Sequence, residues 1–87
     1  MQLNSYAKEI GQRLLFLRLE NGLSRLDVAI WTGIKPETLW FYETGLRCLK
    51  VDTAFKLANY YGVSIDWLAG ISGRRDGSHA GTEEDKG

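Results

Sequence analysis

The fold is decided by residues 23–45, which read LSRLDVAIWTGIKPETLWFYETG. Ser24 is a favourable helix N-cap, and Asp27, three residues later, completes the pattern of a capping box. Gly33 can end that helix in the left-handed conformation. Pro36 suits the first position of a second helix, because a proline has no N–H to leave unpaired there. The spacing therefore predicts two short helices joined by a tight turn, an arrangement that can present one helix to the major groove of DNA.

Further helices are expected on both sides of this unit. A long helix is predicted over residues 5–21, and its inward face is marked by Ile10, Leu14, Leu17 and Arg18. The remaining helices are expected over 36–44, 51–61 and 64–68. No stretch alternates as a strand would, so the sequence predicts an all-α, compact five-helix domain over residues 1–71.

The last segment, residues 72–87, differs in composition from the rest of the chain. Glycines are interspersed with charged residues and serines, and apolar residues are almost absent. Such a segment cannot bury enough apolar surface to offset the entropy that it would lose on ordering. We expect it to be a flexible, disordered tail.

Composition and charge narrow the classes of function. The 87 residues carry 11 Lys and Arg against 11 Asp and Glu, and the resulting net charge of zero argues mildly against non-specific binding to nucleic acid. One Cys and one His exclude an internal disulfide and a structural zinc site. The chain has no signal-peptide pattern and no apolar run of about 18 residues, so a cytoplasmic protein without a membrane partner is expected.

Nothing in the sequence suggests an enzyme. His79 lies in the tail, and no Ser/His/Asp set, metal-ligand cluster or phosphate-binding loop is recognisable. Gly11 and Gly22 are interpreted as residues that mark helix ends. Asp52 and Asp66 are interpreted as charges in the first turns of helices. We therefore expect no catalytic residue, no metal, no cofactor and no small-molecule substrate.

The ordered set of turn, caps and core positions resembles the Cro and phage-repressor type of helix-turn-helix domain, the XRE family. The resemblance covers residues 8–70 and is carried by Ile10-Gly11, Leu17-Arg18, Gly22-Leu23-Ser24, Val28-Ala29, Gly33-Ile34, Thr38-Leu39, Tyr42-Glu43, Gly45, Leu57-Ala58 and Gly62-Val63-Ser64-Ile65-Asp66-Trp67-Leu68. It implies a lambda-repressor-like fold in which the helix over 36–44 enters the major groove. It also implies a structural ion pair between Arg18 and Glu43. The residues agree with this, because both fall on inward faces, where a lone charge is costly and a pair is less so.

The resemblance assigns two groups of DNA contacts to this chain. The positions expected nearest the bases are Pro36, Glu37, Thr38, Trp40 and Phe41. Phosphate contacts are expected from Arg25, Lys35, Thr44, Arg47 and Lys50, whose cations would give a neutral chain the local basic rim that a specific site needs. Glu37 could accept a hydrogen bond from a cytosine N4 amine, and Phe41 could touch a thymine methyl group.

Trp40 and Phe41 depart from the family pattern, which has Gln, Ser, Arg or Lys at the readout positions. An aromatic pair is poorly suited to paired hydrogen bonds with a base, and Glu37 would be repelled by phosphates. Three interpretations of the pair stay open: packing in the core or in a dimer contact, contact with thymine methyls or sugars, and a surface for a protein partner.

The first two helices carry apolar residues where the family usually has polar ones. These residues are Leu15, Phe16, Leu19, Leu26, Ile30 and Trp31. Either the N-terminal segment, with Leu3 and Tyr6, folds over part of this surface, or the surface binds a second copy or another protein. The dimer contact usual in the family, at the C-terminal helices, would instead use Val63, Ile65, Trp67, Leu68 and Ile71.

The sequence therefore predicts a sequence-specific DNA-binding transcriptional regulator, a repressor that binds a palindromic operator as a homodimer. Two recognition helices roughly 34 Å apart would read half-sites one helical turn apart. Such a protein would be cytoplasmic and associated with the nucleoid through double-stranded DNA. The alternative is a protein-interaction module of the same fold, of the antitoxin or anti-repressor type, which would hold a protein partner on Leu15, Phe16 and Leu19 or on Trp40 and Phe41.

Overall fold

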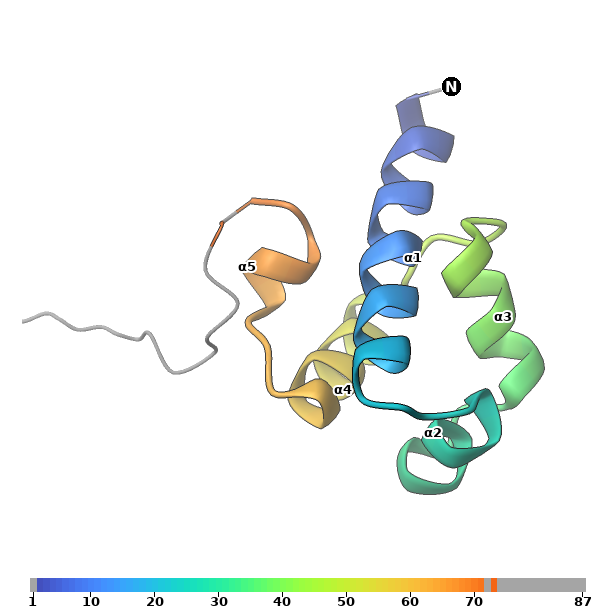
Figure 1. The fold of residues 1–87 in the computed structure, drawn as a ribbon. Helices are drawn as coiled ribbons and strands as arrows, with labels where there is room; N and C mark the ends of the chain where they lie inside the picture. The colour runs from blue at the N-terminus through green and yellow to red at the C-terminus, as the bar shows by residue number, and fades with distance from the viewer. Residues whose placement is uncertain (1, 72, 74–87) are drawn as a thin grey trace, which may run out of the picture.

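Figure 1 shows the arrangement of helices in the computed structural model, which describes residues 2–71 and 73. The helices are α1 (Gln2–Glu20), α2 (Arg25–Thr32), α3 (Pro36–Thr44), α4 (Val51–Tyr61) and α5 (Ile65–Leu68). No β-strand occurs among the described residues, so the prediction of an all-α, five-helix domain is confirmed. The tail predicted over 72–87 lies outside the described residues, apart from Gly73.

α1 stands between α3 on one side and α4 and α5 on the other (Figure 1). It begins at Gln2, earlier than the predicted start near residue 5, and ends at Glu20. Residues 2–5 contain neither Gly nor Pro, so nothing in them ends the helix. The N-terminal residues therefore extend α1 as one rod, and they do not form a separate segment that folds back over the domain.

The hydrophobic core lies where α1 meets the other helices. Leu17, Val28 and Leu57 have no exposed surface at all. The other buried members of the cluster are Ile10, Leu14, Leu39, Tyr42, Ala58, Val63 and Leu68. Truncating a fully enclosed leucine in such a core typically costs about 2–5 kcal/mol, so this small cluster supplies much of the stability of the domain.

The turn between α2 and α3 follows from the residues that surround it. The N–H of Asp27 donates to Ser24 Oγ at 3.0 Å and the N–H of Ser24 donates to Asp27 Oδ2 at 2.8 Å, which is the predicted capping box. The bonds from Ser24, its backbone N–H first, hold the pKa of the Asp27 carboxyl below its usual range. Gly33 ends α2 with a φ of 77°, and its N–H donates to the Ala29 carbonyl at 2.8 Å. Pro36 then opens α3, as predicted.

Gly11 lies inside α1, so the interpretation that it marks a helix end is wrong. A Cβ atom here would lie 2.7 Å from the carbonyl oxygen of Glu43 and closer still to that of Tyr42. Gly45, directly after α3, lies equally close to α1, since a Cβ there would be 2.8 Å from the Cα of Lys8. Glycine at these two positions lets α1 and the end of α3 pack backbone to backbone, and this contact helps to position α3.

Candidate nucleic-acid interface

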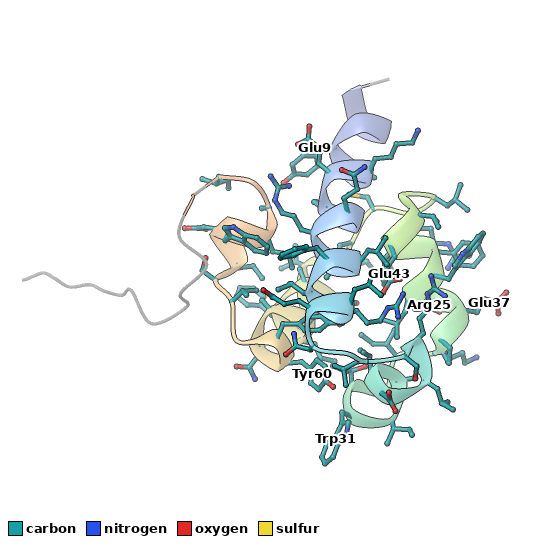
Figure 2. The ribbon with its side chains drawn as sticks, viewed as in Figure 1. Glu9, Arg25, Trp31, Glu37, Glu43 and Tyr60 are labelled. Carbon is teal, nitrogen blue, oxygen red and sulfur yellow. The ribbon has the colours of Figure 1, made fainter. Side chains whose placement is uncertain are left out.

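α3 presents one side to the core and the other to solvent. Its buried residues are Leu39, Tyr42 and Glu43, its exposed residues are Pro36, Glu37, Trp40 and Thr44, and its half-buried residues are Thr38 and Phe41. Figure 2 shows Glu37 projecting away from the molecule, whereas Glu43 points back between the helices. The positions expected nearest the bases thus lie together on an outer surface, which we call the α3 outer face (Pro36, Glu37, Thr38, Trp40 and Phe41).

The two aromatic residues of the α3 outer face contact each other at the surface. Their ring centroids are 5.4 Å apart, with an angle of 60° between the ring planes. Trp40 is 41% exposed, and neither ring belongs to the core cluster. The Cζ atom of Arg47 lies 4.3 Å from the centroid of the Phe41 ring, in a cation–π contact. The structure therefore removes the interpretation that Trp40 and Phe41 pack in the core of one subunit.

A buried ion pair holds α3 against α1. Arg18 Nε lies 2.7 Å from Glu43 Oε2, and an Nη nitrogen of the same guanidinium donates to Glu43 Oε1 at 3.0 Å. Arg18 also donates to the carbonyl of Leu23 at 2.9 Å. The side chains of Arg18 and Glu43 are 9% and 3% exposed. The hydrogen bond to Glu43, partly opposed by burial, raises the pKa of the Arg18 guanidinium. The ion pair expected from the sequence is therefore present, with paired hydrogen bonds.

Arg25 also contacts Glu43, and this contact was not predicted from the sequence. Its Nε donates to Glu43 Oε1 at 3.0 Å, so one carboxylate links α1, α2 and α3. Figure 2 shows Arg25 and Glu43 side by side between these helices. The side chain of Arg25 is 35% exposed, which leaves part of its guanidinium at the surface beside α3. The long sequence separation of the two residues gave no signal for this contact.

The buried carboxylate of Glu43 also affects the pKa of a tyrosine on α4. Burial, followed by the negative charge of Glu43, raises the pKa of the Tyr61 phenol to about 12. The phenol therefore stays neutral beside Glu43 even at the alkaline pH at which an ordinary tyrosine, with a pKa of about 10, ionises.

The other residues expected to contact phosphates precede α3, end it or follow it in the sequence. Lys35 directly precedes the helix, and Arg47 and Lys50 follow it; all three are exposed. The hydroxyl of Thr44 is exposed and donates to the Trp40 carbonyl at 2.8 Å. Lys35 and Arg47 thus flank the α3 outer face in a chain whose net charge is zero, whereas Lys50 is the N-cap residue of α4.

The surface expected to form the dimer is smaller than predicted. Val63 and Leu68 are 6% and 2% exposed and belong to the core, so they have almost no surface to offer a second subunit. They are buried because α5 packs back onto α1 and α4. Ile65 and Trp67 are half-buried, and Ile71 is 76% exposed.

The apolar residues noted on the first two helices remain at the surface. Leu15 is half-buried, and the exposed members are Phe16, Leu19, Leu26, Ile30 and Trp31. Trp31 is 77% exposed and points away from α2 (Figure 2). Tyr6 lies on the same rod as Phe16, ten residues or about 15 Å along its axis, so the N-terminal segment does not cover this surface. The side chain of Leu3 lies outside the described residues.

Other kinds of site find little support in the described part of the chain. Residues 2–71 and 73 contain no group of three or more His, Cys, Asp or Glu side chains that could hold a metal ion. None of the helices within this range combines the length and the apolar character needed to cross a bilayer. Cys48 is an exposed free cysteine in the loop before α4.

Known proteins match the region that contains this site. Residues 14–68 match the helix-turn-helix family. The chain is 39% identical over 56 residues to the cryptic phage CTXphi transcriptional repressor RstR of Vibrio cholerae, a match that covers 64% of this chain and 50% of that protein. The chain thus spans about half the length of this curated relative. The structure of the S. venezulae BldD DNA-binding domain is similar with a TM-score of 0.67 and 33% identity, over 74% of this chain and 96% of that one.

Proposed function

The chain belongs to the XRE-type helix-turn-helix family, and on that premise we propose that it is a sequence-specific DNA-binding transcription regulator that inserts α3 into the major groove. The observation that carries this proposal is the α3 outer face, exposed on a helix that the buried Arg18–Glu43 pair ties to α1. Similarity to a transcriptional repressor and to a DNA-binding domain supports the same function. We further propose that the protein is a repressor that acts at the nucleoid, in the cytoplasm.

Base contacts in this proposal come from the α3 outer face. Glu37 is exposed and can accept a hydrogen bond from the N4 amine of cytosine. Pro36 and Trp40 offer apolar surface, and Thr38 offers a half-buried hydroxyl. Phe41 lies partly beneath Arg47, so its contact with a base would be limited to the edge that remains exposed.

Phosphate contacts would come from the cations around α3. Lys35, Arg47 and Lys50 are exposed, and Arg25 keeps part of its guanidinium at the surface while Glu43 holds its Nε. These cations would orient the protein on the duplex without reading its sequence. If all four contact phosphates in each half of a dimer, the logarithm of the binding constant should fall by about 7 for each tenfold rise in salt concentration.

We propose that two copies bind a palindromic operator, with their recognition helices roughly 34 Å apart. The surface that remains available near α5 consists of Ile65, Trp67 and Ile71. A mostly apolar cavity of about 300 Å³ lies beside it, between α1, the start of α4 and α5, and its lining includes Val51 and Ile65. Covering this surface with a second copy would add to the small core of a short chain.

Selection of bound sequences from a random pool of DNA duplexes tests the proposal. We expect an enriched palindromic consensus and a steep loss of affinity with salt. Lys50→Ala should weaken binding to all sequences alike and reduce the salt slope by about 2 for a dimer, because each subunit loses one phosphate contact. Lys56→Ala is the matched control, since this lysine is also exposed but lies within α4, beside Trp31 and Tyr60.

An interaction module of the antitoxin or anti-repressor type is the second candidate. The observation that favours it is the exposed apolar surface of α2, where Leu26, Ile30 and Trp31 are 61%, 70% and 77% exposed. The same selection separates the two functions. An enriched consensus supports the regulator, whereas a pool without enrichment, at low salt and high protein concentration, supports the interaction module.

A further inference from the structure

The α3 outer face lacks the side chains with which proteins usually read purines. Guanine and adenine are recognised through paired hydrogen bonds from Arg, Lys, Asn or Gln. Pro36 and Phe41 have no polar side-chain atom, and Glu37 only accepts hydrogen bonds when ionised. Trp40 has a single N–H, and Thr38 has a single half-buried hydroxyl. Thr44, the next exposed residue on the helix, uses its proton on the Trp40 carbonyl. The specificity of this helix must therefore rest largely on contacts other than paired hydrogen bonds.

The aromatic pair is held in place from the end of α3. The carbonyl of Phe41 accepts the backbone N–H of Leu46 at 3.0 Å and that of Arg47 at 3.3 Å. These bonds fold the chain after α3 back onto Phe41, where the Arg47 guanidinium covers the ring at 4.3 Å. The Phe41 ring in turn packs against the indole of Trp40. Phe41 is thus a half-buried support, and Trp40 is the apolar surface that α3 turns outward.

The major groove presents one kind of apolar group to such a surface. Among the base edges in this groove, only thymine carries a methyl group, at C5, whereas the other groups are hydrogen-bond donors and acceptors. An indole placed against those polar groups would deprive them of water without replacing most of their hydrogen bonds. An indole placed against a thymine methyl buries apolar surface on both partners.

We propose that Trp40, supported by Phe41 and Arg47, reads the C5-methyl group of a thymine in the major groove and is the main specificity-determining residue of α3. This inference rests on the proposed function, because it requires α3 to enter the groove. It assigns the sequence preference to an apolar contact on Trp40, and it gives Arg47 a second role as the cover of Phe41.

The experiment replaces each thymine of the selected operator by deoxyuridine, which removes the methyl group and keeps the base pair. We expect one position in each half-site to respond, and the two positions to be related by symmetry. A single replacement there should weaken wild-type binding about fourfold, which is the value for burying one methyl-sized group. Trp40→Ala should bind more weakly and should no longer distinguish thymine from deoxyuridine at that position. Its salt slope should equal that of the wild type, because Trp40 carries no charge.

Trp31→Ala is the matched control, because it removes an exposed tryptophan from α2 and should keep the full sensitivity to deoxyuridine. If the wild-type protein binds its operator and no thymine position responds to deoxyuridine, the inference is wrong and the proposed function stands. A response that persists in Trp40→Ala also overturns it. If no DNA sequence is enriched at all, the proposed function fails and the inference fails with it. If Trp40→Ala does not fold, Trp40→Gln takes its place, and a wild-type protein that is insensitive to deoxyuridine overturns the inference in either case.

Discussion

Glu43 is the single residue on which the placement of α3 depends most. Its carboxylate is 3% exposed and receives hydrogen bonds from Arg18 on α1 and from Arg25 on α2. Two guanidinium groups around one carboxylate leave no buried negative charge uncompensated, and one of the cations still reaches the surface. The same side chain thus serves the core and orients a cation beside the proposed DNA interface.

Glu43→Ala should strongly destabilise the domain. The change leaves the Arg18 guanidinium buried without its main acceptor, and breaking a buried pair in this way typically costs about 3–5 kcal/mol. A domain of this size has only about 5–15 kcal/mol to lose, so the urea midpoint should fall markedly. Glu37→Ala, which removes an exposed carboxylate from the same helix, should leave the midpoint nearly unchanged. An unaltered midpoint in Glu43→Ala would show that the pair contributes little to stability.

At the scale of the elements, the contact between α1 and α3 explains how so short a helix is held. α3 spans only Pro36–Thr44, and an isolated helix of that length is not stable in water. Its buried face packs on α1, where Gly11 lets the Tyr42 and Glu43 carbonyls approach the helix backbone. Packing on α1, rather than intrinsic helix propensity, therefore maintains the α3 outer face.

Gly11→Ala tests this contact, because the close approach predicts a loss of stability where an ordinary helix position predicts a gain. In an exposed helix interior, replacing glycine by alanine should stabilise the protein by about 1 kcal/mol. Here the added Cβ would meet two backbone carbonyls, which cannot rotate away as a side chain does, so we expect destabilisation of roughly 1–3 kcal/mol. Thermal unfolding followed by circular dichroism measures the difference, with Gln12→Ala at an exposed position of α1 as the control. A melting temperature above that of the parent would contradict the close approach.

At the scale of the whole molecule, charge and apolar surface are unevenly distributed. The chain is neutral overall, yet Lys35 directly precedes α3 and Arg47 covers Phe41 of the same helix. Besides Trp40 on α3, exposed apolar side chains lie on α1, α2 and α4, in the loop after α3 and beside α5. The proposed repressor requires one surface for DNA and another for a second copy, and our candidates for the two are the α3 outer face and the surface around Ile71.

Ile71→Asp should prevent the proposed dimer without unfolding the domain. Ile71 is 76% exposed, so the substitution does not disturb the core, but a charge there would be buried by a second copy packed on α5. We expect sedimentation equilibrium to report a monomer, and the affinity for a full palindrome to approach that for a single half-site. Leu26→Asp introduces the same charge on α2 and should leave the dimer intact. The reverse pattern would place the dimer interface on α2.

The parts of the fold that the sequence by itself determined are those that depend on neighbouring residues. The capping box of Ser24 and Asp27, the end of α2 at Gly33 and the start of α3 at Pro36 all appear where they were predicted. Each depends on a hydrogen bond or a backbone angle set within a few residues, so the local sequence contains all the information that is needed.

Tertiary structure decided the features that join distant parts of the chain. Arg25 shares Glu43 with Arg18, Gly11 is a contact point rather than a helix end, and Val63 and Leu68 are core residues rather than dimer contacts. None of these could be read from spacing, because a side chain can satisfy the same helical period whether its partner is another helix, a second subunit or solvent. Only the packing of α1 against α3, α4 and α5 selects among those partners, and the same packing turns Trp40 outward.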